Sequence, residues 1–323
     1  MNFLITRLFF ICLIVTLAAC QSESVPNKTW THSEQGLFTA SLSNDASLAL
    51  VASTEGPAKL INTLSNKTLH QWQHTDVNDG IIATAISADK KFAITAEKNS
   101  LALWQINNGK IIGLWDFPNI TDLAISFDGK RALIAMEDNQ AYYFDLYHGK
   151  IIHTFNHAGV VNSVALSNNG QFALTGGNDH QAKLWSLKTG ELAQQWTHSF
   201  KIYKVALSED GKYAMSNASL GKTRLWDTQT GDQLSELPMR YMTVTAGTFS
   251  PDGNSLLTGR PNQRIDLWDV KSGQLLHTWS VKKHLLWRPK TAAIIALSFA
   301  KDGQYFLSES SAGTANQWNV PKN

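Results

Sequence analysis

The chain has 323 residues, of which 43% are hydrophobic and 17% charged, and its formal net charge is +2. This composition suits one large soluble domain or two smaller ones, and so small a net charge argues against a general nucleic-acid-binding role. The two cysteines, Cys12 and Cys20, lie in the first twenty residues, which excludes a disulfide framework from the rest of the chain.

Residues 1–19 have the features of an export signal and are not expected to form part of the fold. Arg7 provides a short positive region, and the apolar run over residues 8–17 is too short to span a bilayer stably. The run ends in Leu17-Ala18-Ala19-Cys20, which resembles the lipobox of bacterial lipoproteins, where the signal is cut before the cysteine and the thiol carries diacylglycerol. An ordinary secretory signal that happens to end in a cysteine is the alternative.

The lipobox resemblance implies that Cys20 is lipidated and that the mature chain is held at a membrane. Gln21 follows the cysteine, whereas in Gram-negative relatives an Asp at that position favours retention in the inner membrane. The resemblance therefore implies an outer-membrane lipoprotein that faces the periplasm, provided that the cell is Gram-negative. Residues 20–27 are expected to be a tether that reaches at most about 25 Å when extended, so the folded part would lie close to the membrane.

From residue 28 to residue 323 the chain repeats one unit seven times. The clearest copy covers residues 161–198 and reads as four short strands separated by tight turns such as Asn169-Gly170 and Thr189-Gly190. Gly and Asn tolerate the positive φ that two-residue hairpin turns require. In every copy, a residue of the first turn is followed 15 or 16 positions later by a residue of the third strand. These pairs are Asp45 and Ile61, Asp89 and Trp104, Asp128 and Phe144, Asn169 and Trp185, Asp210 and Trp226, Asp252 and Trp268, and Asp302 and Trp318.

The period of the repeat indicates the fold. From copy to copy, the third-strand residue advances by 43, 40, 41, 41, 42 and 50 positions. A unit of four strands with a period near 40 residues is typical of a β-propeller, so we predict a single all-β domain with seven blades. The uniform turns at the first and third connections are expected to make one face, the bottom, a plain surface. Variation collects in the second turns and the inter-blade loops of the opposite face, the top.

The repeats resemble the WD40 family. Trp226-Asp227 carries the dipeptide that gives the family its name, and other copies hold this dipeptide or weaker versions of it. The fourth copy also matches the structural tetrad of the family at four positions, which are His157, Thr175, Asp179 and Trp185. The resemblance implies a hydrogen-bonded chain through these side chains that ties an inter-blade loop to the second and third strands.

A catalytic interpretation of the same residues is the alternative, since His and Asp pairs also activate nucleophiles. No suitably placed nucleophile recurs with His157 and Asp179, so the structural role is favoured. The sequence contains neither an HExxH nor a CxxC motif, and we expect no catalytic residue, metal site or cofactor. Most of the 11 tryptophans recur at fixed strand positions, where they are expected to pack between blades. The alternative is a binding role, in which these side chains stack on carbohydrate or dock a quinone.

The last copy has three strands, so the ring needs a fourth strand from elsewhere. Residues 28–32 (KTWTH) match the end of the fourth strand in residues 194–198 (QQWTH). WD40 proteins close their ring in this way, and the resemblance implies that the N-terminal strand completes the seventh blade. This strand would begin at the bottom face directly after the tether. We therefore predict that the bottom face lies toward the membrane and that the top face points into the periplasm.

The longest irregular segment, residues 281–290, joins the sixth and seventh copies and is expected to lie on the top face. Exposed aromatic and Arg side chains anchor many interfaces, and loops on a rigid scaffold often carry recognition. With nearby loops, this segment predicts a basic and aromatic patch suited to an acidic protein segment or an anionic polymer. Its candidate residues are Lys201, Tyr203, Arg240, Tyr241, Arg260, Arg264, Lys282, Lys283, Trp287 and Arg288. Ordinary solvated loop charges, with Trp287 folded back as a plug, are the alternative.

Together these features predict a lipid-anchored, periplasmic WD40 scaffold that is a monomer, binds a protein partner and catalyses no reaction, partly by analogy of fold. One alternative is a binder of an anionic glycan or envelope polymer. A second is a quinoprotein-like propeller enzyme, which has a similar pattern of a turn Gly followed by Trp. The six-residue step from Gly190 to Trp196 is the WD40 spacing, because the Trp of quinoprotein propellers follows the Gly more closely.

Overall fold

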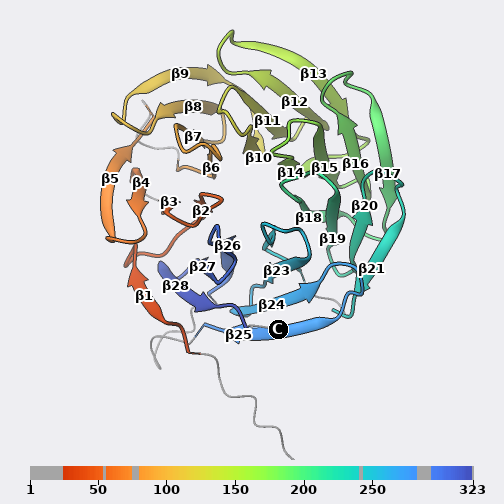
Figure 1. Ribbon diagram of the computed structural model, residues 1–323. Coiled ribbons are helices and arrows are strands. Elements are labelled where there is room, and N and C mark those ends of the chain that lie inside the picture. The colour runs from red at the N-terminus through yellow and green to blue at the C-terminus, as the bar shows by residue number, and fades with distance from the viewer. Residues whose placement is uncertain (1–24, 54–55, 75–79, 240–242, 282–291, 322–323) are drawn as a thin grey trace, which may run out of the picture.

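The computed structural model describes residues 25–53, 56–74, 80–239, 243–281 and 292–321. These residues form seven antiparallel sheets of four strands each, arranged as blades around a central axis (Figure 1). The seven-bladed, all-β propeller predicted from the repeat period is therefore confirmed. Within the described ranges, no helix has the length and apolar character needed to cross a membrane.

In each blade the first strand lies beside the axis and the last lies at the circumference (Figure 1). Blades 1–3 comprise β2 (Thr39–Leu42), β3 (Leu48–Ala52), β4 (Ala58–Asn62), β5 (Lys67–Trp72); β6 (Ala83–Ile86), β7 (Phe92–Ala96), β8 (Ser100–Gln105), β9 (Ile111–Asp116); and β10 (Ile120–Ile125), β11 (Arg131–Met136), β12 (Gln140–Asp145), β13 (Lys150–Asn156). Blades 4–6 comprise β14 (Val161–Leu166), β15 (Phe172–Gly177), β16 (Gln181–Ser186), β17 (Leu192–Thr197); β18 (Ile202–Leu207), β19 (Tyr213–Ala218), β20 (Thr223–Asp227), β21 (Gln233–Leu237); and β22 (Ala246–Phe249), β23 (Ser255–Gly259), β24 (Arg264–Asp269), β25 (Leu275–Ser280). Blade 7 comprises β26 (Ile294–Phe299), β27 (Tyr305–Ser310), β28 (Thr314–Asn319) and, at the circumference, β1 (Lys28–Thr31).

Blade 7 takes its outermost strand from the N-terminal part of the chain. β1 pairs antiparallel with β28, and the register places Trp30 opposite Ala315. Trp30 thus takes the position that Trp196 takes opposite Ala182 in blade 4. Without β1, the edge of β28 would expose a row of unpaired backbone groups. The predicted closure of the ring by the N-terminal strand is confirmed.

The first turn of each blade is shaped by a short Ser-x-Asp motif or a close relative of it. In blade 3, Ser126 Oγ donates to Asp128 Oδ1 at 2.8 Å and accepts from a backbone N–H at the start of β11. Gly129 follows with a φ of +70°, in the left-handed region that suits glycine. Ala46 and Lys90 hold similar angles, +59° and +57°, at the same position in blades 1 and 2. The side-chain bonds of the motif therefore maintain the turn even where glycine is missing.

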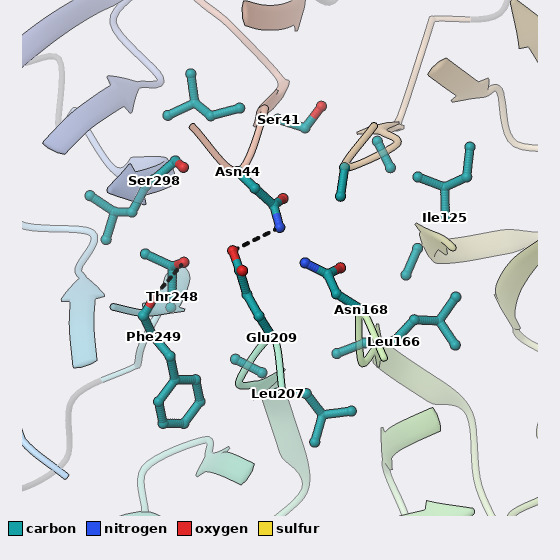
Figure 2. Close-up of a pocket in the computed structure, with 18 of the residues that line it drawn as sticks. Ser41, Asn44, Ile125, Leu166, Asn168, Leu207, Glu209, Thr248, Phe249 and Ser298 are labelled. Carbon is teal, nitrogen blue, oxygen red and sulfur yellow. Dashed lines mark hydrogen bonds between the residues drawn. The ribbon is translucent and has the colours of Figure 1, made fainter. Parts of the chain in front are cut away.

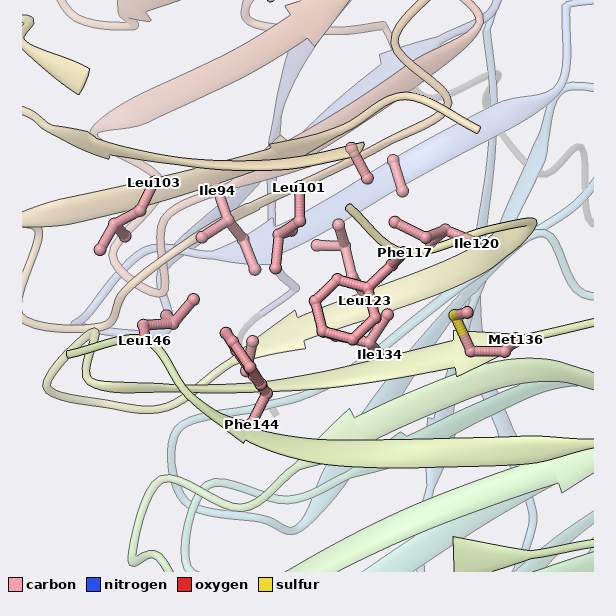
Figure 3. Packing of buried hydrophobic residues seen from close by; sticks show 13 residues of the cluster. Ile94, Leu101, Leu103, Phe117, Ile120, Leu123, Ile134, Met136, Phe144 and Leu146 are labelled. Atoms are coloured by element: carbon pink, nitrogen blue, oxygen red, sulfur yellow. The ribbon is translucent and has the colours of Figure 1, made fainter. Parts of the chain in front are cut away.

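Neighbouring blades pack face to face through buried apolar side chains. Figure 3 shows the boundary of blades 2 and 3, where Ile94 and Leu101 come from one sheet and Ile134 and Phe144 from the next. All four are buried, and Phe144 meets Phe117 edge to face with ring centroids 5.1 Å apart. Burial of this apolar area is the main force that holds separate sheets in a ring.

Aromatic side chains of the third and fourth strands meet across the blade boundaries near the circumference. Trp72 of β5 stacks on Trp104 of β8 with ring centroids 5.2 Å apart. Trp72 Nε1 also donates to the Gly109 carbonyl oxygen of the neighbouring blade at 3.0 Å. Trp196 and Trp226 repeat the stacking between blades 4 and 5, with centroids 5.0 Å apart. The recurring tryptophans therefore fill and bond the boundaries between blades.

Candidate functional site

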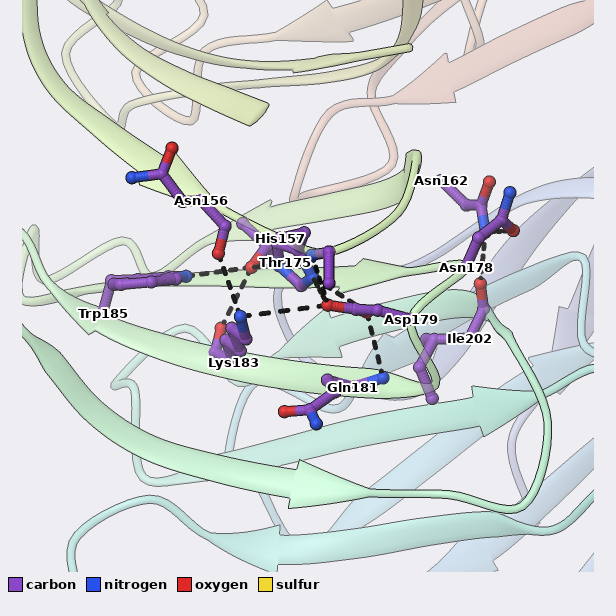
Figure 4. Close-up of polar contacts among 11 residues, drawn as sticks. Asn156, His157, Asn162, Thr175, Asn178, Asp179, Gln181, Lys183, Trp185 and Ile202 are labelled. Atoms are coloured by element: carbon purple, nitrogen blue, oxygen red, sulfur yellow. Dashed lines mark hydrogen bonds and ion pairs between the residues drawn. The ribbon is translucent and has the colours of Figure 1, made fainter. Parts of the chain in front are cut away.

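The four tetrad residues of blade 4 form one hydrogen-bonded chain (Figure 4). His157, in the loop after β13, has its Nδ1 2.9 Å from the carboxylate of Asp179, which lies in the turn between β15 and β16. His157 Nε2 lies 2.7 Å from Thr175 Oγ1, and Trp185 Nε1 donates to the same oxygen at 2.9 Å. The carboxylate also accepts from two backbone N–H groups. The structure thus brings all four residues together and links the loop to both strands.

The burial of the tetrad opposes a catalytic role. Burial lowers the pKa of His157 below its ordinary value, and the contact with Asp179 offsets only part of that effect. Burial acts to raise the pKa of Asp179, but the bonds from His157 and from backbone N–H groups hold it below its ordinary value. At neutral pH the pair is a neutral imidazole beside an ionised carboxylate. The side chain of His157 is 0% exposed, so a substrate cannot reach it while the loop is in place.

Shorter versions of the tetrad recur in other blades. In blade 2, His74 Nε2 lies 2.8 Å from Thr95 Oγ1, which accepts from Trp104 Nε1. Blade 5 repeats this arrangement around the buried His198. Burial lowers the pKa of both His74 and His198 to about 4, so both are neutral at neutral pH. A chain of bonds that recurs at equivalent places in the ring is expected of a packing device rather than of an active site.

A cavity of about 280 Å³ lies on the propeller axis and is lined by the innermost strands and their first turns (Figure 2). Asn44 Nδ2 donates to Glu209 Oε1 at 3.0 Å, which joins the first turns of blades 1 and 5. Lys204 Nζ lies 3.4 Å from Asp122, which joins the innermost strands of blades 5 and 3. These polar groups form bridges between blades. Among the described residues, no three His, Cys, Asp or Glu side chains come close enough to hold a metal ion.

Most of the residues predicted to bind a partner or a lipid fall outside the described ranges. This is the case for the lipidation residue Cys20 and for six of the ten patch residues. Those six are Arg240, Tyr241, Lys282, Lys283, Trp287 and Arg288. They remain predictions.

The structure corrects the prediction for Arg260. Its side chain is buried, and its Nη2 lies 2.5 Å from Asp266, whose side chain is 0% exposed. Arg264 Nε contacts the same carboxylate at 2.7 Å and is itself half-buried. Asp266 lies on β24 and places its carboxylate beneath the turn that carries Arg260. Arg260 therefore neutralises a buried acid instead of presenting a positive charge at the surface, and Arg264 shares that acid.

The other two described candidates are exposed together in blade 5. Lys201 and Tyr203 lie at the start of the innermost strand β18, and both are exposed. Tyr203 is the extra residue of a β-bulge in β18, because Ile202 and Lys204 pair with consecutive residues of β19. Bulges turn a side chain away from the regular face of a sheet.

At the position of Tyr203, three of the seven blades carry a side chain that bonds to the next blade at the top of the axis. In blade 3 the equivalent residue is Thr121, whose hydroxyl donates to the carbonyl of the next blade's innermost strand. Asn162 and Thr245 make the same contact from blades 4 and 6. A tyrosine at this position exposes its ring to solvent instead.

Two further exposed apolar residues, which the sequence interpretation missed, lie beside Tyr203 and Lys201. Phe200 is 43% exposed in the loop before β18, and Leu220 is 57% exposed in the turn between β19 and β20. The backbone N–H of the residue before Leu220 donates to the Lys201 carbonyl oxygen, so loop and turn are joined. We call Phe200, Lys201, Tyr203 and Leu220 the blade-5 top patch. The available signal was Leu220 at the turn position that Asp138 and Asp179 occupy in blades 3 and 4.

Comparison with known proteins supports the WD40 assignment of the repeats. The family model "WD domain, G-beta repeat" matches residues 149–186, which cover most of blade 4 and its tetrad. "Periodic tryptophan protein 2" from Arabidopsis thaliana is 33% identical to this chain over 82 residues. That match covers 25% of this chain and 8% of the relative, so the chain accounts for less than a tenth of that protein's length.

WD40 propellers typically serve as non-catalytic scaffolds for protein interactions. A buried tetrad in the matched repeat, partial tetrads in neighbouring blades and closure by the N-terminal strand agree with that architecture. This chain is a seven-bladed β-propeller, and its fourth blade matches the WD40 repeat.

Proposed function

We propose that this chain is a lipid-anchored, periplasmic scaffold that binds an apolar segment of a protein partner on its top face and catalyses no reaction. The blade-5 top patch is the observation that carries the proposal. Its three apolar side chains are each 43% exposed or more, and they lie on a loop, a strand and a turn of one blade. Exposed apolar side chains that are grouped on a rigid support mark interaction sites more often than single ones.

The backbone of Leu220 supports a functional role for the patch. Its φ is +55°, in the left-handed region where an ordinary side chain costs about 1–2 kcal/mol. The left-handed residues of the corresponding turns in blades 3, 4 and 6 are Asn139, His180 and Gln263, which are all polar, and Asn and His tolerate this region best. A leucine there gains no burial in return, because more than half of its surface is exposed. Strain of this kind persists where the side chain has a task outside the fold.

The charges of the described top face favour a protein partner over an anionic polymer. Arg260 and Arg264 share Asp266, and Lys204 pairs with Asp122. These contacts reduce the positive field that an anionic glycan would need. The apolar members of the patch are unaffected by them. An apolar segment with a flanking acidic residue, which Lys201 could contact, suits this surface best.

The anchoring part of the proposal rests on the lipobox resemblance and on the position of β1. The outermost strand of each blade begins at the bottom face, and β1 begins there with Lys28. A chain held through Cys20 therefore enters the propeller from the bottom, which directs the blade-5 top patch away from the membrane. Replacement of Cys20 by Ser should release the chain from the membrane fraction. Unchanged membrane retention of that variant would contradict the anchor.

The binding part can be tested with substitutions taken from the protein's own repeats. Tyr203→Thr introduces the residue found at this position in blades 3 and 6, and Leu220→Asp introduces the residue found at the aligned turn position in blades 3 and 4. Both changes should keep the fold. Crosslinking in the native envelope, followed by affinity purification and mass spectrometry, should recover about tenfold less of one partner protein with the double variant.

The matched control is Phe127→Asn on the bottom face. Phe127 is 51% exposed, and blades 1 and 4 carry Asn at the equivalent place. This variant should capture the partner as well as the natural chain does. Equal capture by all three chains would contradict the proposal. Capture that disappears when the salt concentration is raised to 0.5 M would instead support the anionic-polymer alternative, because exposed charges are then screened.

A further inference from the structure

The outer edge of the bottom face differs from blade to blade, in contrast to the plain surface expected from the repeated turns. In blades 1–3, the third turn and the start of the outermost strand carry a band of exposed apolar side chains. We call this band the lower rim arc. Its members, each between 44% and 82% exposed, are Leu64, Leu69, Ile111, Ile112, Tyr147 and Ile151.

A positive charge accompanies the arc in each of the three blades. At the position where the outermost strand begins, blades 1–3 carry Lys67, Lys110 and Lys150, and all three are exposed. The pairing of the third and fourth strands makes these positions equivalent to Glu191 in blade 4 and Asp232 in blade 5. The same rim therefore changes from basic to acidic between blades 3 and 4.

The apolar side chains decrease over blades 4 and 5. Blade 4 keeps one of them, Leu192, which is 45% exposed and lies at the position of Ile111 and Ile151. Leu64 and Tyr147 occupy one position of the third turn in blades 1 and 3, and blade 5 has Gln229 there. Ile111 lies opposite Trp104 in blade 2, and the residue in the same place in blade 5 is Gln233. Packing within a blade does not require the apolar residues, since blade 5 forms the same four-stranded sheet without them.

The arc adjoins the place where the proposed anchor enters the fold. β1 lies at the circumference between β25 of blade 6 and β5 of blade 1 (Figure 1). Val25, which precedes β1, is 65% exposed at the bottom. Blade 6 extends the apolar character on the other side of β1 with the exposed Leu275 and Leu276. Blades 4 and 5, which have the acidic rim, are the part of the ring that the arc leaves out.

We propose that the lower rim arc rests on the anionic phospholipid surface of the membrane that holds the chain, with blades 4 and 5 tilted away from it. This inference rests on the proposed anchor at Cys20. Lysines near an anionic leaflet are attracted to its surface potential, and apolar and tyrosine side chains enter the region between headgroups and acyl chains. A tether reaching at most about 25 Å keeps the rim close enough to make this contact.

Hydrogen–deuterium exchange of the full chain on vesicles tests the contact without any substitution. The vesicles contain phosphatidylcholine, alone or with about a third of phosphatidylglycerol. We expect slower exchange in residues 106–116 of blade 2 on the anionic vesicles. The equivalent residues 228–237 of blade 5 should exchange at the same rate with and without vesicles. Equal protection of both segments, or none in blade 2 when the chain is bound, would overturn the proposal.

Two charge variants with the same net change sharpen the test. Lys110→Glu with Lys150→Glu should lower partitioning onto the anionic vesicles about tenfold or more at low salt. Lys98→Glu with Lys201→Glu, which places the same change on the top face, should have a much smaller effect. Equal losses in the two double variants would overturn the arc, because net charge alone would then explain the binding.

The Cys20→Ser chain separates this inference from the proposed anchor. If it still binds anionic vesicles with blade 2 protected, the arc contacts lipid without help from the anchor. If the unsubstituted chain binds both kinds of vesicle without protection of blade 2, the anchor stands and the arc fails. Protection of blade 2 in native envelope but not on lipid vesicles would also overturn the arc, and would indicate a protein on this surface.

Discussion

Blade 4 and blade 7 contain the same four-stranded antiparallel sheet but assemble it by different routes. Blade 4 is one continuous segment, β14 to β17, and its strands are joined by short turns. Blade 7 joins β26, β27 and β28 to β1, which lies at the opposite end of the chain. Short hairpins close small loops at low entropic cost, whereas the pairing of β1 with β28 must close a loop of almost the whole domain. The stability of the ring therefore depends most on its least local contact.

The two blades also differ in how they hold a buried carboxylate. In blade 4, Asp179 is bonded by His157 and by two backbone N–H groups. In blade 7, the side chain of Glu309 is 0% exposed, and His32, just after β1, lies 2.9 Å from it. Within the described residues, neither side-chain oxygen of Glu309 forms a hydrogen bond, and the contact with His32 is a close approach of polar atoms. One blade shares the charge among several donors, and the other relies on one pair that joins the two ends of the domain.

Deletion of residues 28–32 should lower the stability of the protein more than any other change considered for these two blades. It removes the strand that covers the edge of β28 and leaves Glu309 without its partner. We expect a loss of more than about 5 kcal/mol in the free energy of unfolding, measured by urea denaturation. Deletion of residues 21–24 is the control and should change the midpoint little. A small effect of the first deletion would mean that the ring is stable while open.

Removal of single histidines should have the next largest effect, and the loss of stability should differ between the two blades. His32→Ala leaves the buried side chain of Glu309 without its polar contact and should cost about 3 kcal/mol. His157→Ala should cost less, because Asp179 keeps its backbone donors. Adding Glu309→Gln to His32→Ala should recover part of the loss, and thermal unfolding of the three variants measures this. Equal costs for the two histidines, or no recovery in the double variant, would refute the idea that blade 7 relies on one polar contact.

Acidification should weaken the blades that hold a neutral, buried histidine. The pKa of His74 and of His198 is lowered to about 4 by burial, so the unfolded chain binds protons at these histidines more readily than the folded chain does. Their stabilising effect is complete above a pH of about 6.5 and is lost as the pH falls toward 4. Between pH 7 and pH 5 each should cost about 2 kcal/mol.

Urea denaturation over this pH range measures the effect. A His198→Asn variant should be less stable at pH 7 but should lose less stability on acidification than the natural chain. An identical pH dependence of the two chains would show that His198 is not one of the groups responsible.

Thr175→Val is expected to have the smallest effect of the series. The substitution keeps the volume but removes the oxygen that contacts both His157 and Trp185. The expected cost is about 2 kcal/mol, because two hydrogen bonds are lost and the buried ring nitrogens of His157 and Trp185 are left unpaired. Differential scanning calorimetry should detect it, and Thr175→Ser should restore most of the stability. If Thr175→Val does not change the stability, the tetrad positions the loop but contributes little to the free energy of unfolding.

Much of the fold could be predicted because the repeats carry the same local chemistry. The Ser-x-Asp turns and the tryptophans at fixed positions recur in register, so the strand count and blade count follow from the period. The closing strand was recognisable because residues 30–32 repeat the Trp-Thr-His of residues 196–198. The tetrad was recognisable because His157, Thr175, Asp179 and Trp185 keep fixed spacings within one blade.

Contacts outside the period could not be predicted in the same way. The burial of Arg260 depends on Asp266, which reaches it only through the turn between two strands. The blade-5 top patch joins Phe200 to Leu220 across a loop and a turn that no motif connects. The pair of His32 and Glu309 comes from opposite ends of the domain.

Sequence alone determined the number of blades, the strands within them and the closing strand, because these depend on local periodicity and turn chemistry. The tertiary structure decided which charges are neutralised, which apolar residues stay exposed and which rim of the ring is basic. Those properties depend on how side chains from different blades meet at a boundary or a face. The spacing of these residues in the sequence does not predict such contacts, because they form only when the blades close into a ring.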